Sequence, residues 1–384
     1  MKKHTIRVLG GVVLSLALAA STAACGTADT GGGEAGKCEG TIGFMGALSG
    51  GNASIVLPSF NGAKLALKQF LAKNKDCKVT LKEFDSEGDP AKAAPLATQI
   101  ATDKKFIGVI GGAFSGETEG TKKTFEEAGV TMVSQSATAT ALTTENPVSN
   151  FHRVVGHDAT QGAAIAIYAT NTLEAKKLFV VDDGTTYGKP LADTVVEKAG
   201  KIVAGRDQVQ EKQTNFSSTV SKVKSSKADA VVYLGYAREA GPFLKQLRAA
   251  GVTIPFLGGD GLYGADFPKA AGAQAEGAII TCPCLPGSEA AGSFKDDYEA
   301  EYGEAPGAYA AEGFDAMNIF LDAIKAGNTT RPKVEKFVDA YDKEGATKHL
   351  KFDDKGDVDE SSVVVWSYVI EGGSLAPDEE IALK

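Results

Sequence analysis

The chain contains few of the residues that usually bind metal ions. It has only four histidines and five cysteines in 384 residues. No H-E-x-x-H sequence and no pair of C-x-x-C sequences is present, and these are common ligand patterns of zinc sites. We therefore predict no metal site.

The chain also lacks two motifs that are typical of enzymes. The nearest approach to the dinucleotide-binding pattern G-x-G-x-x-G is GGAFSG at residues 111–116, which has no middle glycine. Ser115 lies in AFSGE, which is not the G-x-S-x-G of a serine hydrolase, and only His152, His157 and His349 could serve it as a base. We therefore predict a protein that is not an enzyme and that binds no cofactor.

Positive charge is in short supply as well. The 40 Lys and Arg residues are outnumbered by 49 Asp and Glu residues, which gives a formal net charge of −9 at pH 7. A nucleic-acid partner needs positive groups that replace the counterions of its phosphates. The charge balance therefore disfavours nucleic-acid binding, and we interpret it mainly as a contribution to solubility.

The apolar run near the N-terminus is too short for a membrane-spanning helix. It covers residues 8–20 and follows the basic residues Lys2, Lys3 and Arg7, whereas a bilayer needs about 20 apolar residues. A basic start, a short apolar core and small residues before a cleavage point are typical of a secretory signal peptide. The small residues here lead into Cys25, in a sequence that resembles a bacterial lipobox.

We predict that residues 1–24 are the signal peptide and that a lipidated Cys25 anchors the mature protein to the outer face of the cell membrane. Thr22 stands where a lipobox usually has leucine, and ordinary signal cleavage with an incidental Cys25 is the alternative. Residues 25–37 contain almost nothing that could be buried, so we expect a flexible linker with a root-mean-square length of about 20 Å. Loss of the signal leaves 37 basic and 49 acidic residues, a net charge of −12.

The other four cysteines agree with an oxidising compartment. Cys38 precedes the apolar run TIGFM, and Cys77 precedes KVTLKEF. If these runs are neighbouring parallel strands, the two cysteines meet at one sheet edge, and a disulfide there is worth about 3 to 4 kcal/mol in the chain-entropy model. We predict this bond. The C-P-C sequence of Cys282 and Cys284 leaves two alternatives open, a local disulfide or two free thiols.

Short continuous apolar runs alternate with amphipathic stretches along the rest of the chain, which is long enough for two domains. Continuous apolar runs are typical of parallel strands that are covered on both faces. Apolar residues recur at helical spacing in residues 60–71 and 240–247. The pattern predicts an α/β fold with mostly parallel sheets. The expected strands include 106–112, 131–136, 178–183, 229–235, 254–259, 277–281 and 362–370, and the expected helices include 117–128, 307–326 and 333–342.

A series of motifs, taken in order, resembles the branched-chain amino-acid binding proteins, the soluble receptors of ATP-driven (ABC) importers. The resemblance covers essentially the whole chain after the linker and depends on the order and spacing of the motifs. It implies the type I periplasmic-binding fold, in which two Rossmann-like lobes are joined by three hinge crossings. The motifs are GALSG at 46, FNGAKLAL at 60, FDSEGDPAKA at 84, VIGGAFSGET at 109, VSQSAT at 133, FHRVVGHDATQG at 151, DDGTTYGK at 182, YLGYAREAG at 233, FLGGDG at 256 and APGAYAAEGFDA at 305.

Two neighbouring strand ends carry small hydroxyl residues. Ser115 follows one buried strand at the start of a predicted helix, where free N–H groups and the helix dipole favour an anion. Ser136, Ala137 and Thr138 follow the next strand, and ligands of open α/β sheets bind beyond the carboxyl ends of strands. The resemblance implies that Ser115 and Thr138 bind the ligand carboxylate and that the backbone of Ser136 and Ala137 completes the contacts. Helix capping is the alternative role for Ser115.

The resemblance also assigns the remaining ligand contacts. Asp260, in FLGGDG, stands where the family has an acidic residue for the ligand ammonium, and a turn residue is its alternative role. Tyr187 and Tyr236 match aromatic positions that face the cleft, and Asp158 begins the helix after the first crossing. Ile55 replaces a family tryptophan, which leaves the shape of the side-chain pocket open. For Tyr309 and Phe314, the cleft and the core are both open alternatives.

The resemblance implies an extracytoplasmic monomer that binds a small amino acid, valine, leucine or isoleucine before others, and delivers it to an ABC permease. We expect an N-terminal lobe of residues 38–157 plus 283–361 and a C-terminal lobe of 158–282 plus 362–384. The lobes would close on the ligand about crossings near His157, Cys282 and Ser362. The alternative is a sensor of the same fold that binds another amino acid, an amide or a small organic acid and signals to a membrane partner.

Overall fold

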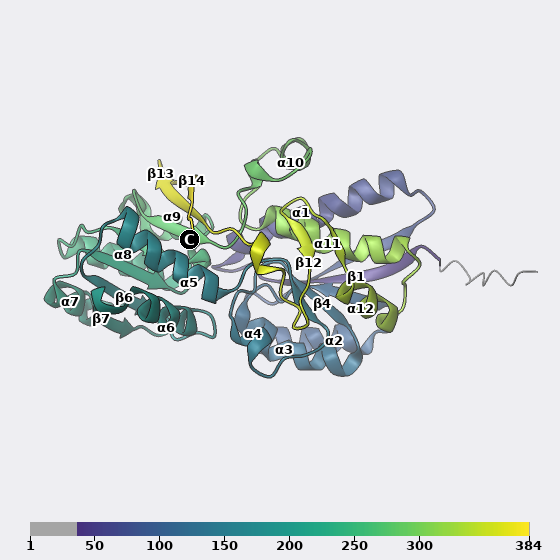
Figure 1. The fold of residues 1–384 in the computed structure, drawn as a ribbon, viewed down its shortest axis with the longest axis horizontal. Coiled ribbons are helices and arrows are strands. Elements are labelled where there is room, and N and C mark those ends of the chain that lie inside the picture. The colour runs from purple at the N-terminus through teal and green to yellow at the C-terminus, as the bar shows by residue number, and fades with distance from the viewer. Residues whose placement is uncertain (1–36, 384) are drawn as a thin grey trace, which may run out of the picture. The chain divides into compact units, whose positions relative to one another are not determined.

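Two main β-sheets organise residues 37–383, which are the residues that the computed structural model describes (Figure 1). These residues belong to one compact unit. The predicted signal peptide, the lipidation site at Cys25 and the linker up to residue 36 lie outside the described residues. No helix among residues 37–383 combines the length and the apolar character that crossing a bilayer requires.

The first sheet has five parallel strands in the order β2-β1-β3-β4-β5. Helices α1 and α11 cover one face, and α2 and α3 cover the other (Figure 1). We call this sheet and its helices the N-terminal lobe. Its elements are β1 (Glu39–Gly46), α1 (Ala53–Lys73), β2 (Lys78–Asp85), α2 (Pro90–Thr102), β3 (Phe106–Ile110), α3 (Ser115–Ala128), β4 (Thr131–Ser134), α4 (Ala141–Thr144), β5 (Phe151–Arg153), α10 (Phe294–Tyr302), α11 (Ala310–Lys325), α12 (Arg331–Asp339), β11 (Asp342–Glu344) and β12 (His349–Lys351).

The second sheet has seven strands in the order β14-β13-β10-β9-β8-β6-β7. Its strands are parallel from β7 to β10, and β13 and β14 add an antiparallel edge. We call this sheet and its helices the C-terminal lobe. Its elements are α5 (Asp158–Ile167), β6 (Leu178–Asp182), α6 (Gly188–Ala199), β7 (Val203–Gln208), α7 (Ser217–Ser226), β8 (Ala230–Leu234), α8 (Ala237–Ala249), β9 (Phe256–Gly258), α9 (Asp266–Ala271), β10 (Ile279–Cys282), β13 (Trp366–Glu371) and β14 (Ser374–Glu380).

Strand β6 shows why the apolar runs form two-sided strands. Leu178 and Val180 pack with the residues of α5 and α6, whereas Phe179 and Val181 pack with those of α7 and α8. Successive side chains of a strand point to opposite faces, so a strand that is buried on both faces must be apolar at every position. The fold class predicted from the sequence is therefore confirmed.

The parallel parts of the two sheets have the same topology. The strand order 2-1-3-4-5 of the first sheet is repeated as 7-6-8-9-10 in the second. The chain passes between the lobes after β5, after β10 and again before β13. Parallel strands in this order place all their carboxyl ends at one edge of each sheet, which is where the candidate site lies.

Several element ends differ from the sequence prediction. Helix α3 begins at Ser115 itself, because the N–H of Thr118 already donates to the carbonyl of Phe114. Helix α12 ends at Asp339, and Asp342 belongs to a short hairpin of β11 and β12. The predicted strand 362–370 begins only at Trp366, because the residues before it form the third crossing.

The structure joins the four cysteines of the described residues in two disulfides. Cys38 is bonded to Cys77 at the edge where β1 and β2 begin side by side. Cys282 is bonded to Cys284 across Pro283, in the second crossing. Both Cys282 and Cys284 are fully buried. The first bond closes a loop between adjacent strands, and the second restrains a segment that connects the lobes.

Candidate functional site

A cavity lies between the carboxyl ends of the strands of the two lobes. Protein atoms leave about 240 Å³ unfilled there, part of which is open to solvent. Both lobes contribute to its lining, so neither lobe forms it alone. The lining residues are Ile55, Ala113, Phe114, Ser115, Ser136, Thr138 and Tyr309 from the N-terminal lobe, and Tyr187, Tyr236, Asp260 and Gly261 from the C-terminal lobe.

Ser115 is the first residue of α3, and its side chain is 2% exposed. Its Oγ accepts a hydrogen bond from the N–H of Ala139 at 3.1 Å. A hydroxyl has one proton to donate, so the Ser115 proton is available to an acceptor in the cavity. The N–H groups of Ser115 and Gly116 precede the first intrahelical hydrogen bond and add the donors of a helix N-terminus.

Ser136 and Ala137 make their hydrogen bonds within the protein. The Ser136 hydroxyl donates to the carbonyl of Ala113 at 2.8 Å. The N–H of Ala137 donates to Ser134 Oγ at 3.0 Å, and Ala137 is not a lining residue. Ser136 lines the cavity, but its N–H donates to Ser134 Oγ and its hydroxyl to the carbonyl of Ala113. These two residues therefore shape the loop after β4.

Thr138 differs from its neighbours because its Oγ1 has no hydrogen-bond partner, although the residue is 1% exposed. Arg153 holds the carbonyls on both sides of it, donating to Ala137 at 3.1 Å and to Ala139 at 2.9 Å. Arg153 is itself fully buried and paired with Asp357 at 2.5 Å. A rigidly held, buried hydroxyl without a partner is destabilising unless a ligand satisfies it.

Asp260 accepts hydrogen bonds from two tyrosines. Tyr187 donates to Oδ1 at 2.7 Å, and Tyr309 donates to Oδ2 at 2.5 Å. Tyr187 also belongs to the C-terminal lobe, whereas Tyr309 precedes α11 of the N-terminal lobe and so reaches across the cavity. Burial raises the pKa of Asp260, and the two tyrosine hydrogen bonds offset this only in part. Tyr309 is therefore a residue of the site.

Asp158 is a second buried acid near Asp260. It is 1% exposed, it is not a lining residue, and neither of its carboxylate oxygens has a hydrogen-bond partner. Its N–H donates to the carbonyl of Thr138 at 2.8 Å. Burial, and next the negative charge of Asp260, raise the pKa of Asp158 well above its ordinary value. The neighbouring Thr138 hydroxyl, which does not have hydrogen-bond geometry, and the positive charge of Arg153 both lower this pKa and offset the rise in part.

Aromatic and aliphatic groups form the rest of the wall. Tyr236 packs edge to face against Phe114 with their ring centroids 5.3 Å apart, and against Tyr187 at 5.2 Å. Ile55 is 5% exposed and lines the cavity from α1. Phe314, by contrast, packs against Phe294 at 5.2 Å and does not line the cavity. The wall has an apolar part that lacks charged groups.

Glu117 lies one layer behind the start of α3. Its carboxylate accepts from the N–H of Phe114 at 3.1 Å and from the Ser86 hydroxyl. It is fully buried, and burial raises the pKa of Glu117 to about 7 although both hydrogen bonds lower it. It fixes the segment that leads into Ser115.

The two lobes also make contact beside the cavity, through the start of α1 and the start of α9. The N–H of Ser54 donates to Asp266 Oδ2 at 3.1 Å, and the N–H of Asp266 donates to Ser54 Oγ at 3.0 Å. Gly264 lies so close that a Cβ there would be 2.5 Å from Ser54 Oγ and 3.1 Å from Ile55 Cγ1. This reciprocal pair joins the two lobes.

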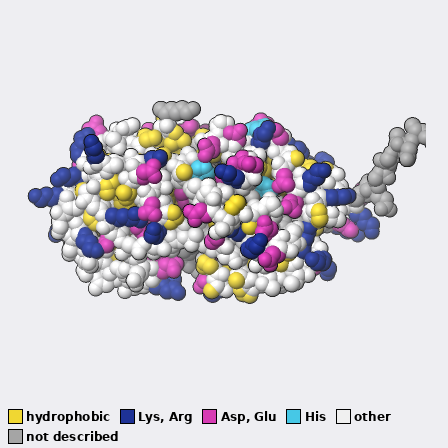
Figure 2. Space-filling view, turned by 60° about the horizontal axis from the view of Figure 1, so that its bottom comes forward, with side chains coloured by type: hydrophobic (Ala, Val, Ile, Leu, Met, Phe, Trp, Pro, Cys, Tyr) yellow, Lys and Arg dark blue, Asp and Glu magenta, His cyan; other side chains and the backbone are white. Residues whose placement is uncertain are grey.

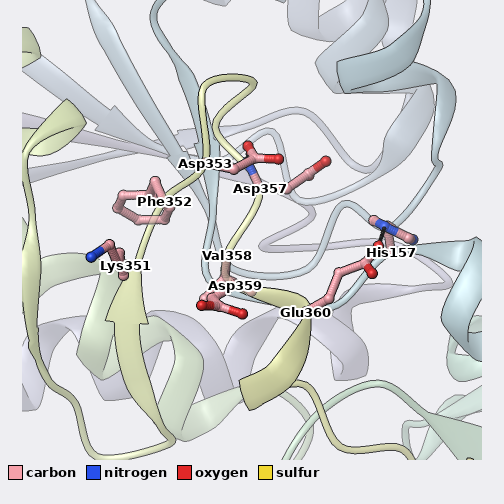
Figure 3. A pocket seen from close by; sticks show the side chains of 8 residues that line it. All are labelled: His157, Lys351, Phe352, Asp353, Asp357, Val358, Asp359 and Glu360. Atoms are coloured by element: carbon pink, nitrogen blue, oxygen red, sulfur yellow. Dashed lines mark hydrogen bonds and ion pairs between the residues drawn. The ribbon is translucent and has the colours of Figure 1, made fainter.

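A second hollow lies beside the crossings and has a different character (Figure 3). Its lining includes His157 from the first crossing and Glu360 from the third, and His157 Nε2 is 2.9 Å from Glu360 Oε1. Asp353 and Asp357 lie near each other in the same hollow (Figure 3). No group of three or more ligand residues within 37–383 has the geometry for a metal ion. We therefore interpret this hollow as a contact between the first and third crossings and not as a metal site.

The structure thus brings most of the predicted ligand residues together in one cavity. Seven of the nine line it: Ile55, Ser115, Ser136, Thr138, Tyr187, Tyr236 and Asp260. Ala137 and Asp158 lie adjacent to it without lining it. The sequence analysis gave no role to Phe114, Ala113 and Gly261, which also line it, or to Arg153. These residues lie in the motifs VIGGAFSGET, FHRVVG and FLGGDG, which is the sequence feature that could have identified them.

Comparisons with known proteins identify the family and the fold. The family model described as "Periplasmic binding protein" matches residues 39–359. The Leu/Ile/Val-binding protein of Citrobacter freundii is 29% identical over 327 residues, which cover 83% of this chain and 87% of that protein. The Leucine-specific-binding protein of Salmonella typhimurium is 28% identical over 340 residues, which cover 87% of this chain and 92% of that protein.

Among solved structures, the branched-chain amino acid transporter substrate binding protein LivJ from Streptococcus pneumoniae, in complex with isoleucine, is similar with a TM-score of 0.81 and 27% identity. The match covers 89% of this chain and 99% of LivJ. The two sequence relatives are named as binding proteins, and LivJ is named as a transporter substrate binding protein. The chain therefore has the type I periplasmic-binding fold and belongs to the periplasmic binding protein family.

Proposed function

We propose that this protein binds a small amino acid between its lobes, with valine, leucine and isoleucine as the preferred ligands, and delivers it to an ABC importer. One observation carries the proposal. The cavity has unsatisfied hydroxyl and N–H donors on one side, at Thr138 and the start of α3, and the buried carboxylate of Asp260 across from them in the other lobe. That arrangement matches a zwitterion.

The carboxylate end of the ligand is assigned to the N-terminal lobe. Ser115 Oγ has a proton to donate, Thr138 Oγ1 has no partner, and the first N–H groups of α3 are free of intrahelical bonds. Hydrogen bonds to a charged acceptor are worth about 1.5–3 kcal/mol each. The positive end of the helix dipole adds to them without a full charge in the site.

The ammonium end is assigned to Asp260, with Asp158 as the second acid. Both carboxylates are buried, and each raises the electrostatic cost of ionising the other. An ammonium group placed near the two carboxylates adds positive charge there, beyond that of Arg153, which acts on Asp158. Asp158 lies behind the lining, so its contribution is mainly through its charge and its backbone bond to Thr138.

The apolar wall is assigned to the ligand side chain. Ile55, Phe114 and Tyr236 offer apolar surface and no charge. Burying one aliphatic side chain contributes about 1.5–3 kcal/mol. The similarity to proteins named for leucine, isoleucine and valine supports this ligand class.

Hinge closure is the proposed mechanism, with the lobe boundaries at residues 157/158, 282/283 and 361/362. The Tyr309 to Asp260 hydrogen bond, the Ser54 and Asp266 pair and the Phe114 and Tyr236 contact all join the two lobes. We interpret the described arrangement as the closed form. A ligand that contacts both lobes favours that form, because it binds it more tightly than the open one.

We further propose that the protein acts outside the cytoplasm as a monomer, anchored by a lipid on Cys25 and docking on an ABC permease. The support is the signal-like sequence of residues 1–24, the lipobox-like Cys25 and the two disulfides. Mass spectrometry of the membrane fraction, with Cys25→Ser as the comparison, tests the lipid directly.

The test of ligand binding is calorimetry and thermal shift with single amino acids. A ligand at about 100 times its dissociation constant adds about 2.7 kcal/mol to the free energy of unfolding. We expect stabilisation by leucine, isoleucine or valine. Thr138→Val removes the unpartnered hydroxyl and keeps the shape, so it should weaken binding roughly 10- to 150-fold with little loss of stability.

Ser136→Ala is the matched control, because its hydroxyl is bonded to the carbonyl of Ala113. This variant should lose stability and keep most of its affinity. Asp260→Asn should abolish the response to amino acids. A protein that responds only to sugars or nucleosides, or a Thr138→Val variant that binds like the wild type, contradicts the assignment.

A further inference from the structure

Unpaired lysines gather at one edge of the N-terminal lobe. The parallel strands of the first sheet begin there, so this edge is opposite to the one that carries the ligand cavity. Figure 2 shows dark blue side chains at both ends of the molecule, including the right-hand end, which is the end of the N-terminal lobe. We call the group the lysine rim; it consists of Lys37, Lys78, Lys104, Lys105, Lys333 and Lys336.

The members of the lysine rim are close in space although they are distant in sequence. Lys78, Lys104 and Lys105 line one shallow hollow together with Thr329. Lys333 and Lys336 line a second hollow together with Asn328, the residue before Thr329. The two hollows therefore adjoin.

Arg331 fixes this arrangement from below. It is 8% exposed and donates to the carbonyls of Asp103 and Phe106, each at 2.9 Å. These bonds attach the first turn of α12 to the loop that carries Lys104 and Lys105. Lys37 completes the rim, because its carbonyl accepts from the N–H of Glu39, which lines the first hollow. The rim thus has a defined geometry.

The six lysines are exposed, and none of them forms an ion pair with another part of the described chain. The acidic groups among them are Glu39, Asp103 and Asp342, and Asp342 is already paired with Lys351 at 2.8 Å, so positive charge prevails. Lysines in the last turn of a helix often compensate the helix dipole. That explanation fails for Lys78, Lys104, Lys105 and Lys333, which lie outside any last helical turn. This local surplus of positive charge contrasts with the net charge of −9 of the whole chain.

Helix α12 adds an amphipathic surface to the rim. Lys333, Lys336, Phe337 and Ala340 are spaced i, i+3, i+4 and i+7, which puts them on one side of the helix and its C-terminal end, and they line the second hollow together. Phe337 is half-exposed between the lysines. Basic groups around an accessible aromatic ring suit the interface of a membrane.

The described chain also begins in the rim, at Lys37, and 36 residues precede it. We propose that, before the protein engages the permease, the lysine rim docks on the anionic phospholipid surface of the membrane and leaves the ligand cavity facing the surrounding solution. The inference rests on the proposed anchoring at Cys25. A short linker keeps the rim at a high effective concentration near the bilayer.

The test uses the chain from residue 25 with Cys25→Ser, so that no lipid is attached. Its flotation is measured with vesicles of phosphatidylcholine, pure or mixed with phosphatidylglycerol. Each lysine near an anionic surface contributes about fivefold to partitioning, so Lys104→Glu with Lys105→Glu should lower it at least about 30-fold. Lys333→Glu with Lys336→Glu should do the same. Binding should disappear in about 1 M salt, where the Debye length is about 3 Å.

Lys176→Glu with Lys177→Glu is the matched control. These exposed residues precede β6, the counterpart of β1 in the other lobe, and carry the same charge change. This variant should float like the unchanged protein. Equal flotation with both vesicle types, or an equal loss in the control, overturns the proposal.

Rim variants that float normally but fail to support transport would assign the lysines to a protein partner instead, which also overturns it. Calorimetry with leucine on the same variants separates membrane docking by the lysine rim from the proposed binding of an amino acid in the cavity. The rim variants should keep their affinity for the amino acid whatever the vesicles show. Absence of lipid on the wild-type Cys25 refutes the proposed anchoring, but it does not change the amino-acid affinities that calorimetry measures.

Discussion

A single methyl group at Gly264 tests the proposed closure of the lobes. The Cβ of Gly264→Ala would lie 2.5 Å from Ser54 Oγ and 3.1 Å from both Ile55 Cγ1 and the carbonyl carbon of Ser54. These three nearest atoms belong to α1 of the opposite lobe. Gly264 does not have a positive φ, so alanine fits its backbone conformation. The substitution should therefore be tolerated whenever the lobes are apart.

The expected loss of affinity follows from the same contacts. Real Cβ atoms essentially never approach another heavy atom within 3.0 Å, so something must move. The Ser54 hydroxyl can rotate away only by giving up its hydrogen bond from the N–H of Asp266. Extra methyl groups in well-packed contacts cost about 1–3 kcal/mol. Because the cost falls on the closed form alone, amino-acid affinity should drop about 5- to 150-fold.

Calorimetry with leucine measures that drop, and thermal unfolding without ligand measures the effect on stability. Gly51→Ala is the matched control: it adds the same methyl just before α1, where a Cβ would have no neighbour within 4 Å. We expect this variant to bind normally. The proposed closure is refuted if Gly264→Ala binds as tightly as Gly51→Ala, or if its loss of affinity is matched by an equal loss of stability in the absence of ligand.

Three further predictions concern the buried polar groups. Tyr309→Phe removes a hydrogen bond between the lobes and should weaken ligand binding about 10- to 150-fold. Tyr187→Phe removes a hydrogen bond within one lobe and should lower the stability of the protein more than its affinity for the ligand. A larger loss of affinity in Tyr187→Phe than in Tyr309→Phe, measured by calorimetry beside melting curves, contradicts this. The pKa values of Asp158 and Asp260 are raised, and a ligand ammonium favours their ionised forms. Amino-acid affinity should therefore already fall at pH values well above about 4, and calorimetry should detect protons released on binding. An affinity that does not change with pH contradicts this. Burial raises the pKa of Glu117 to about 7 from 4.5, so Glu117 stabilises the protein below pH 4.5 and this stabilisation is lost as pH rises through about 7. Relative to Glu117→Gln, the free energy of unfolding of the wild type, measured with urea, should fall by up to about 3 kcal/mol over that range. Parallel pH profiles of the two proteins contradict this.

The fold was predictable because its strands are covered on both faces. A strand such as β6 must be apolar at every position, and that leaves a signal in one sequence. The antiparallel pair of β13 and β14 leaves a weaker signal. β14 is largely exposed and reads as an acidic tail, Ser-Leu-Ala-Pro-Asp-Glu-Glu, which has no strand pattern. Its pairing with β13 is decided by the neighbouring strand and not by its own residues.

The site was predictable where a strand end determines it and less so where distant segments meet. Ser115 and Thr138 follow adjacent strands, so the topology alone brings them together. Tyr309 comes from residues that are 49 positions beyond Asp260 in the chain, and it has a φ of 55°, which non-glycine residues rarely adopt. Periodicity shows that a tyrosine is buried, but it does not show which lobe its hydroxyl reaches.

The repeated topology explains why two lobes are needed for one small ligand. Each sheet ends in an edge of N–H groups and short polar side chains, and helix N-termini follow the parallel strands of both lobes. Two such edges would both favour an anion. Asp260 and Asp158 place two buried acids on the side of the C-terminal lobe. Under the proposed assignment, the ligand ammonium favours the ionised forms of these acids, so the cavity selects a molecule with opposite charges at its two ends, and neither lobe alone provides both partners.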